Sequence, residues 1–284
     1  MTGTYLKYMS LALFLAITWA NPVLALSTMP EKPQNASLSL GVEYASGNYG
    51  TASNIRSFYM PLIATWSPTD RLDVGIEIPF LYQSSPSVTT ELYNASLSTT
   101  TAETTPSGAA VAGYSGARGS SRSGVSGLGD IILRLGVIAL AEDSKVPQLR
   151  PSLYVKCPSA DVSKGLGTGE FDFGVGIEAS KWLGNAQLIG EGFYTFQGKA
   201  EGFNLQDYLS YTAAVGYQVT ENIKPMLMVR GATAPTTVSG VLLEARARVI
   251  WTLTGNTSLD LYGSRGIADA SPEYGGGLAV IYAF

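Results

Sequence analysis

The sequence of 284 residues contains no histidine. Histidine is the side chain that most often acts as a general base, so a serine or cysteine nucleophile activated by histidine cannot be assembled from this chain. The single cysteine, Cys157, stands directly before Pro158 on the expected outward face of a strand, and we interpret it as a small apolar residue. We therefore predict that the protein is not an enzyme.

Recognisable patterns for cofactors and metals are also missing. The run from Gly165 to Gly169 is rich in glycine, but no Lys-Ser or Lys-Thr pair follows it, and it leads into an expected strand rather than a helix. We interpret this run as a turn. We predict no cofactor and no bound metal.

Charged residues and long apolar runs are scarce. Only 14% of the residues are charged and the mean hydropathy is +0.14, whereas glycine and tyrosine are abundant. Beyond residue 25 the sequence has no run of about 18 apolar residues, the length expected of a membrane-spanning helix. A structure that crossed a membrane would therefore have to satisfy its backbone hydrogen bonds between strands, and a closed barrel does so.

The amino terminus has the pattern of an export signal. Lys7 precedes the apolar run 10–20, and small residues follow at 23–25, where a signal peptidase could cut. A membrane-spanning helix would need about 20 apolar residues, and Asn21 and Pro22 interrupt the run too early. We predict a signal peptide at residues 1–25 and a mature domain at 26–284. The mature chain has 17 basic and 22 acidic residues, which does not favour nucleic acid as a partner.

Apolar and polar residues alternate along the mature chain. In the range 71–83, for example, Leu72, Val74 and Ile76 stand at every second position. This period of two predicts twelve strands, at residues 36–45, 54–66, 71–83, 127–139, 148–157, 170–182, 186–197, 207–219, 223–233, 241–253, 257–266 and 273–284.

The connections between these strands alternate in length. Mostly short turns at 67–70, 141–147, 183–185, 220–222 and 254–256 alternate with longer loops at 46–53, 84–125, 158–168, 198–206, 234–240 and 267–272. Bacterial outer-membrane barrels have short periplasmic turns, long external loops and an even number of strands. We therefore predict an all-β fold, a transmembrane antiparallel up-and-down β-barrel of twelve strands in a bacterial outer membrane, with residues 84–125 as a long external loop.

The last predicted strand, residues 273–284, has one bulky face and one small face. Val280, Tyr282 and Phe284 share the bulky face. A buried strand of a soluble sandwich can alternate in the same way, but aromatic residues at the end of an apolar stripe suit a membrane interface. This ending resembles the carboxy-terminal signal of bacterial outer-membrane barrels. We assign Tyr282 and Phe284 to an assembly signal for the barrel-assembly machinery and expect outer-membrane lipid on the bulky face.

With the apolar face outward, the inward face carries nine acids and eight bases. These lumen charges are Glu43, Arg71, Asp73, Glu77, Asp130, Arg134, Arg150, Lys156, Asp172, Glu178, Glu191, Lys224, Arg230, Glu244, Arg246, Arg248 and Asp260. Two interpretations stay open: a packed network of salt bridges, or a selective pore. The balance of signs argues against a dedicated anion channel, although four of the bases, Lys224, Arg230, Arg246 and Arg248, form a local basic patch.

Several apolar and aromatic residues share the inward parity. They are Tyr154, Phe193, Met226, Met228 and Tyr262. They could line a path for apolar or aromatic cargo, or they could pack the lumen.

Two prolines lie on the neighbouring strands 54–66 and 71–83. Pro61 and Pro79 each remove one hydrogen-bond donor from the ladder. One interpretation is a seam between these strands that opens laterally, and the other is a pair of bulges that bend the wall.

A motif-rich segment, residues 126–182, resembles a known family. Its residues are Ser126-Gly127-Leu128-Gly129-Asp130, Pro151, Tyr154-Val155-Lys156, Pro158, Asp161, Lys164-Gly165-Leu166-Gly167-Thr168-Gly169 and Asp172. This pattern resembles the proteobacterial outer-membrane transporters of the phenol-degradation meta-pathway type. The chain departs from that pattern mildly at residues 157–160. The resemblance implies uptake of small compounds, including aromatic ones.

We therefore expect an outer-membrane barrel that allows passive or facilitated uptake of small molecules, aromatic or hydrophobic ones among them. The alternative is a structural or surface-adhesion barrel that does not conduct. Its long Ser/Thr-rich loop, residues 84–125, would then meet partners outside the cell.

Overall fold

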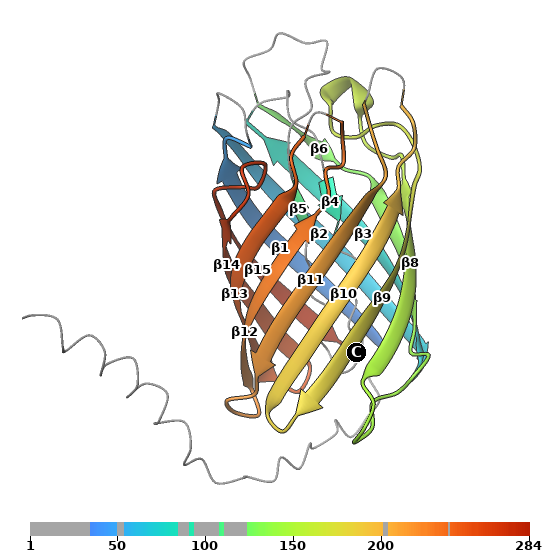
Figure 1. Ribbon diagram of the computed structural model, residues 1–284, viewed down its shortest axis with the longest axis vertical. Coiled ribbons are helices and arrows are strands. Elements are labelled where there is room, and N and C mark those ends of the chain that lie inside the picture. The colour runs from blue at the N-terminus through green and yellow to red at the C-terminus, as the bar shows by residue number, and fades with distance from the viewer. Residues whose placement is uncertain are drawn as a thin grey trace, which may run out of the picture. The chain divides into compact units, whose positions relative to one another are not determined.

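The computed structural model describes residues 35–49, 54–84, 91–93, 108–110, 124–200, 204–237 and 239–284 (Figure 1). The predicted signal peptide lies outside the described residues, as does most of the predicted loop 84–125. Among the described residues, no helix has the length and apolar content needed to cross a membrane.

In chain order the elements are β1 (Ala36–Gly47), β2 (Ile55–Thr69), β3 (Leu72–Gln83), β4 (Glu91–Tyr93), β5 (Gly108–Ala110), β6 (Val125–Leu128), β7 (Ile131–Val137), β8 (Gln148–Cys157), η1 (Val162–Lys164), β9 (Asp172–Leu183), β10 (Ala186–Phe196), β11 (Tyr208–Tyr217), β12 (Ile223–Ala232), β13 (Leu242–Thr254), β14 (Thr257–Gly266) and β15 (Tyr274–Ala283).

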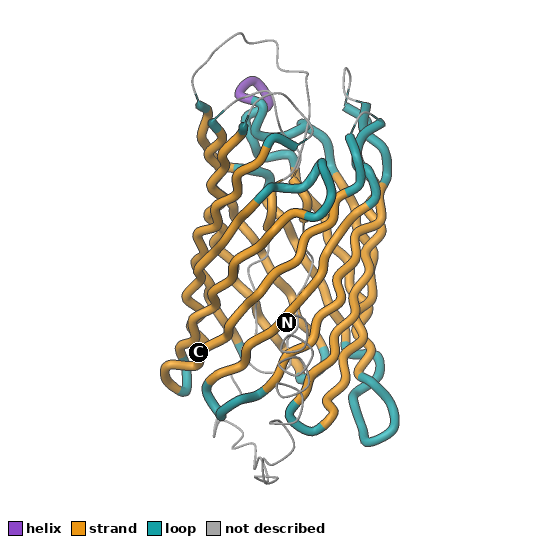
Figure 2. Tube along the Cα trace, turned by 60° about the vertical axis from the view of Figure 1, so that its left-hand side comes forward, coloured by secondary structure: helices purple, strands orange, loops and turns teal. Residues whose placement is uncertain are grey.

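The strands close into a barrel. In the main sheet each strand pairs antiparallel with its neighbours, and β15 returns to pair with β1, where Ser37 lies opposite Ala283. β6 and β7 both pair with β3 and together form one continuous stave. The described chain therefore forms a closed antiparallel barrel of twelve staves, which confirms the predicted fold (Figures 1 and 2).

The two faces of the wall differ as the alternation predicts. On β1, Leu40 is 59% exposed on the outside, whereas Ser39 is 1% exposed on the inside. Outward Leu, Val, Ile and aromatic side chains continue around the barrel. A lipid environment suits this outward face, because it presents apolar side chains where a soluble protein would present polar ones.

Aromatic side chains gather near both ends of the outward face. Tyr274, Tyr44, Phe58 and Tyr82 form a row across four neighbouring strands, with ring centroids 6.3, 5.1 and 6.1 Å apart. Near the other strand ends, tryptophans 66, 182 and 251 are exposed just before three of the short turns. Aromatic girdles at these two levels are typical of barrels that sit between two membrane interfaces. The carboxy terminus lies at the short-turn end (Figure 2).

The two prolines face each other directly. Pro61 pairs with Pro79, and the β2–β3 register continues without a break from Ser57 to Trp66. The interruptions lie on the far sides of this hairpin. The β1–β2 ladder has no partners at residues 41 and 42, and the β3 ladder changes register between its pairings with β6 and β7. The continuous β2–β3 register gives no support to a seam there, and one of the two expected bulges is present, on the far side of β3 beside Pro79.

The bulge explains the split of the predicted strand 127–139. Phe80 pairs with Leu128 and Glu77 pairs with Ile132, so three residues on the β6–β7 stave lie opposite two on β3. Pro79 cannot donate a hydrogen bond there, but its carbonyl accepts one from the Gly129 amide at 2.9 Å. The extra residue turns Asp130 inward, where it is completely buried.

Three short elements were not predicted from the sequence. β4 and β5 pair as a small hairpin within the predicted loop 84–125, and β5 lies beside β1 and β2. The 3-10 helix η1 lies in the β8–β9 connection, where the Asp161 side chain accepts a hydrogen bond from the Ser163 amide and Gly165 ends the helix with a positive φ of 71°. All three elements are only three residues long and carry no periodic signal.

Candidate functional site in the lumen

The barrel closure gathers most of the predicted lumen charges on its inner face. Buried there are Glu43, Asp73, Glu77, Asp130, Arg134, Arg150, Lys156, Asp172, Glu178, Lys224, Arg230, Glu244, Arg246, Arg248 and Asp260. Arg71 is an exception. It lies in the turn between β2 and β3, one residue before β3 begins, and its side chain is exposed. Glu191 is half-buried on β10, opposite Glu178 on one side and Thr212 on the other.

One set of ion pairs joins β2, β3, β7 and β8. Glu77 accepts hydrogen bonds from both the Arg134 guanidinium and the Tyr59 hydroxyl. The Arg150 guanidinium forms an ion pair with the Asp73 carboxylate, and Arg150 Nε donates to Asp73 Oδ1 at 3.1 Å. A glycine makes this contact possible: a Cβ at Gly136, on the stave between them, would lie 2.0 Å from Arg150 Nη2.

Lys156 on β8 is the centre of the neighbouring charge cluster. Its Nζ lies 3.1 Å from Asp130 Oδ2 and 2.8 Å from Asp172 Oδ2. It also donates to Thr168 Oγ1 at 3.3 Å. One buried cation thus links the bulge, the start of β9 and the β8–β9 loop.

A second set of ion pairs lies on β12, β13 and β14. Arg246 donates from Nε to Glu244 at 2.6 Å, and Arg230 Nε lies 3.4 Å from the same carboxylate oxygen. Arg248 makes a two-pronged contact with Asp260, at 2.7 Å for each nitrogen–oxygen pair. Parallel guanidinium–carboxylate contacts of this kind are among the strongest polar contacts in proteins.

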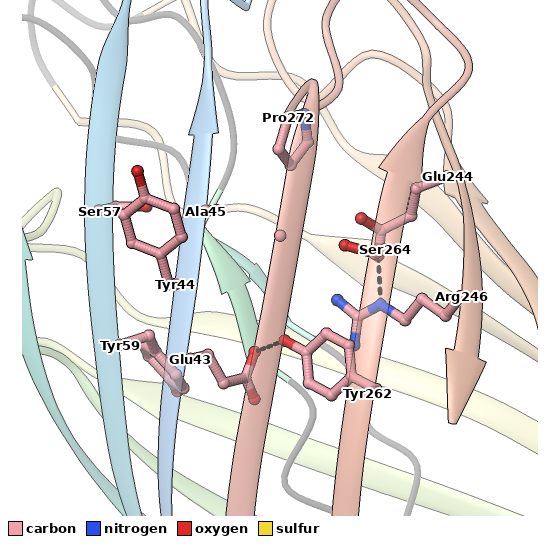
Figure 3. Close-up of a pocket in the computed structure, with 11 residues that line it drawn as sticks. Glu43, Tyr44, Ala45, Ser57, Tyr59, Glu244, Arg246, Tyr262, Ser264 and Pro272 are labelled. Carbon is pink, nitrogen blue, oxygen red and sulfur yellow. Dashed lines mark hydrogen bonds and ion pairs between the residues drawn. The ribbon is translucent and has the colours of Figure 1, made fainter. Parts of the chain in front are cut away.

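A small pocket opens beside this second set (Figure 3). Glu43 from β1 and Tyr262 from β14 meet there, with the hydroxyl donating to Glu43 Oε2 at 2.5 Å. The Arg246 guanidinium lies over the Tyr262 ring, 4.2 Å from its centroid. Glu244 also lines the pocket. The pocket therefore gathers a carboxylate, a guanidinium and an aromatic ring within one small space.

The four bases of the predicted basic patch do not form one basic surface, because each contacts a different set of neighbours. Arg248 is matched by Asp260, and Lys224 lies apart, donating to Gln187 Oε1 at 2.9 Å with its Nζ 5.5 Å from the centre of the Trp182 ring. In the described ranges no group of three Cys, Asp or Glu side chains is placed to hold a metal ion. The arrangement supports charge pairing along the inner wall.

The residues predicted as a cargo path occupy three separate places. Tyr154 and Phe193 are buried together with Ile132, and the Tyr154 hydroxyl lies 2.7 Å from Thr195 Oγ1. The methionines, 226 and 228, lie further along the wall on β12, where the first is buried and the second half-buried. Tyr262 lines the pocket. Along the described wall they do not form one continuous stripe.

Three of these residues lie against a glycine on the adjoining strand. Tyr154 lies opposite Gly174, where an added Cβ would come within 2.0 Å of its ring. Phe193 and Tyr262 have the same relation to glycines 176 and 277, at 2.5 and 2.4 Å. The rings therefore lie flat along the wall instead of projecting across the bore, as occurs where aromatic residues cover strand glycines.

The loop end of the barrel holds a further apolar cluster. Its members are Tyr49, Ile55, Tyr208, Ala232, Leu242 and Ala270, all buried. Tyr49 lies in the loop after β1, and burial raises the pKa of its hydroxyl well above the usual value. This cluster joins strands from opposite parts of the sheet order at the mouth.

Sequence reasoning missed two inward residues that matter to the lumen. Tyr59, on β2, donates to Glu77 and is 4% exposed. Leu166, in the β8–β9 loop, is completely buried against Tyr59 and Leu81. The parity of Tyr59 was available from the sequence, and Leu166 is a large apolar residue among glycines, but only the folded loop shows where it points.

The residues that carry the family resemblance come together in space. A Cβ at Gly127 would lie 2.7 Å from Leu166 Cδ1, and one at Gly167 would lie 3.0 Å from both carboxylate oxygens of Asp130. Lys156 joins the same assembly through Asp130. The two glycine-containing motifs are therefore the two sides of one packed contact.

Comparisons with known proteins agree with this architecture. The family model described as "Putative MetA-pathway of phenol degradation" matches residues 89–284. No curated protein matches the chain. The COG4313 outer membrane channel from Pseudomonas putida F1 has a TM-score of 0.63 at 13% identity, with 89% of this chain and 97% of that chain covered.

Two further solved structures are similar. The KdgM porin has a TM-score of 0.53 at 7% identity, with 87% and 99% of the two chains covered. The CymD monoaromatic hydrocarbon channel has a TM-score of 0.50 at 12% identity, with 90% of each chain covered. At these identities the likeness is one of fold.

Proposed function

The chain belongs to the family described as "Putative MetA-pathway of phenol degradation", and we propose that it is an outer-membrane channel for passive or facilitated uptake of small molecules. The observation that carries this proposal is the closed barrel with an apolar outer face and an ionic inner face. Such a wall separates lipid from a polar interior. A solute can pass through this interior and cross the membrane without contact with the hydrocarbon.

Aromatic or hydrophobic molecules are the solute class that we favour. The names of the similar structures, an outer membrane channel, a porin and a monoaromatic hydrocarbon channel, support small solutes in general. Within this chain, the half-buried Met228 and Tyr262 offer apolar contact on the inner wall. Their neighbours Arg230 and Arg246 make the same part of the wall polar.

Reconstitution of the purified barrel tests this proposal. We expect current in planar bilayers and swelling of proteoliposomes with small aromatic solutes, compared with aliphatic solutes of matched size. Deletion of residues 84–125 should increase the flux if this loop covers the mouth, as β5 beside β1 and β2 suggests. If neither the full mature chain nor the deletion variant passes any solute, the channel proposal is wrong.

A non-conducting structural or adhesion barrel is the second candidate. The paired ions and the apolar cluster at the mouth favour it, because both can fill space that a channel would leave open. In that case deletion of residues 84–125 would abolish binding to a surface and leave uptake by whole cells unchanged. The same deletion therefore separates the two candidates.

We also propose that the carboxy terminus is recognised by the barrel-assembly machinery after export by the signal at residues 1–25. Tyr282 and Phe284 are 45% and 59% exposed on the outward face, with ring centroids 4.9 Å apart. The Phe284 amide donates to the Ala36 carbonyl at 2.8 Å, so the last residue also closes the barrel. Deletion of Phe284 should lower the amount of folded barrel in the outer membrane. Unchanged assembly would contradict this role.

A further inference from the structure

Two arginines stand on the outward face of the wall, at the end where the long loops lie. Arg56 is the second residue of β2, and Arg265 is the last but one of β14. Arg56 lies on the same face as the exposed Phe58 and Leu62. Arg265 lies on the same face as the exposed Leu261. Both arginine side chains are exposed, so they point away from the lumen into the surroundings of the barrel.

The ladder pairs place the two arginines in one row across four neighbouring strands. Ser46 lies opposite Arg56 on one side and opposite Tyr274 on the other, and Tyr274 lies opposite Arg265. Because neighbouring strands are about 4.8 Å apart, the three steps of this row span about 14 Å of the wall. The Ser46 side chain is completely buried and donates to Asn54 Oδ1 at 3.0 Å. The exposed groups of the row are therefore the two guanidiniums and the Tyr274 ring between them.

This row lies at the level of the aromatic girdle. Tyr274 is the first ring of the series that continues through Tyr44, Phe58 and Tyr82. Arg56 is two residues closer to the loops than Phe58 on the same face, a step of about 7 Å along the strand. Aromatic rings at a membrane interface lie at the level of the lipid headgroups. The two guanidiniums are therefore placed where headgroups carry their phosphates.

The charges of the two arginines are not neutralised by the described part of the chain, in which no ion pair involves Arg56 or Arg265. The opposite end of the wall differs. There the outward Lys181 of β9 lies 3.3 Å from Glu142 Oε1 and donates to the Val146 carbonyl at 3.3 Å. The described strands of the main sheet carry no other outward basic side chain and no outward acidic one. Outward positive charge without a partner in these strands is thus confined to the loop end.

We propose that Arg56 and Arg265 bind the phosphates of a lipid in the outer leaflet, with Tyr274 packed against the lipid between them. A charged group beside hydrocarbon is costly, and an anionic headgroup removes this cost. The planar guanidinium binds phosphate through two parallel hydrogen bonds. Both long side chains can lean toward Tyr274, so the row suits a headgroup with two phosphates, such as diphosphorylated lipid A. The surface is separate from the lumen, and the inference does not depend on conduction.

Binding of diphosphorylated lipid A to the purified, delipidated barrel tests this proposal. Native mass spectrometry from a neutral detergent, at increasing lipid concentration, gives the dissociation constant. Arg56→Gln and Arg265→Gln should each weaken binding about fivefold, and the double variant about 30-fold, because each basic residue near a lipid surface contributes a factor of about five.

Arg71→Gln is the matched control. Arg71 is an exposed arginine that follows the same strand, β2, at the opposite end of the wall. This variant should bind lipid A as the wild type does. All three substituted side chains are exposed, and heat-modified mobility in electrophoresis would show that the variants are folded barrels.

Two further ligands separate lipid phosphate from other contacts. Lipid A without its phosphates should bind equally to the wild type and to the double variant, and inorganic phosphate alone should not bind. If the double variant binds diphosphorylated lipid A as tightly as the wild type, the assignment is wrong. If inorganic phosphate binds the wild type as tightly as lipid A does, the arginines form a site for free anions and the lipid proposal is wrong.

Discussion

The two charge clusters of the lumen, around Lys156 and around Glu244, have opposite ratios of acidic to basic side chains. Around Lys156, one cation serves two carboxylates, Asp130 and Asp172. Around Glu244, one carboxylate serves two guanidiniums, those of Arg230 and Arg246. The near balance of acids and bases along the chain therefore conceals a local excess of acid on one side and of base on the other.

The surroundings of the two centres also differ. The Lys156 cluster is tied to the bulge and to the β8–β9 loop, and its cation is 3% exposed. The Glu244 cluster adjoins the pocket, where Tyr262 is half-buried. The first cluster is therefore joined to a loop and the second lies beside a pocket, although the charged side chains of both are buried.

The largest expected effect is the loss of the Lys156 cation. Lys156→Met leaves two buried carboxylates without their shared partner, and removal of one member of a buried ion pair typically costs about 3–5 kcal/mol. We expect a lower denaturant midpoint for barrel unfolding in detergent. Lys164→Met is the control, because its pair with Asp161 is 3.6 Å long and well exposed, where about 0–1 kcal/mol is usual. Equal midpoints for the two variants would refute a structural role for the Lys156 cluster.

Loss of the Glu244 carboxylate should change ion selectivity. Glu244→Gln leaves Arg230 and Arg246 as neighbouring buried cations, so we expect the reversal potential in a salt gradient to shift toward anion preference. Lys156→Met, if it still forms a channel, should shift the potential less, because its cluster faces the loop. Glu221→Gln, in an exposed turn, is the control and should leave the potential unchanged. No shift in Glu244→Gln would place this cluster outside the path.

A smaller effect is expected where the wall is continuous. Leu62 and Ile78 lie directly opposite on β2 and β3, so a disulfide between Leu62→Cys and Ile78→Cys in a Cys157→Ser background should form across the paired prolines. Because this ladder is unbroken, uptake should be the same before and after reduction of the bond. Faster uptake on reduction would support lateral opening between β2 and β3.

The smallest expected effect concerns the cap of η1 in the β8–β9 loop. Hydrogen bonds from Ser163, with the nearby Lys164 charge, lower the pKa of the Asp161 carboxyl. A lowered folded pKa means that the cap stabilises the loop above the unfolded pKa and is lost as the pH falls through the folded value. Asp161→Asn, which can cap at every pH, should remove this acid dependence from nuclear magnetic resonance signals of the loop. If these signals keep the same pH dependence in Asp161→Asn, Asp161 is not the group that causes it.

Sequence periodicity was sufficient for the strands. β8 and β14 begin and end where the alternation predicts, and most other ends differ by one or two residues. The reason is physical: a strand between lipid and a polar interior must expose apolar side chains on one face only, so the signal repeats at every second residue. The bulge at Asp130 escaped this reasoning, because one inserted residue leaves the pattern intact on both sides.

The candidate site could be predicted only in part. The alternation identified which charges face inward. The prediction for Arg71 was wrong, because this residue lies in the turn before β3 and not in the strand. The ion-pair and hydrogen-bond partners of these charges could not be predicted from the alternation. Lys156 meets Asp130 and Asp172 across two different strand connections, and Glu43 meets Tyr262 only because β1 and β15 close the barrel.

The amino-acid sequence by itself determined the class of wall, its strands and the direction of nearly every side chain, because these follow from local backbone geometry and from the two environments that the wall separates. The tertiary structure alone decided which ions pair, where the bulge falls and that Leu166 packs against Tyr59 and Leu81. Those features depend on register and closure, which bring together residues that no local pattern connects.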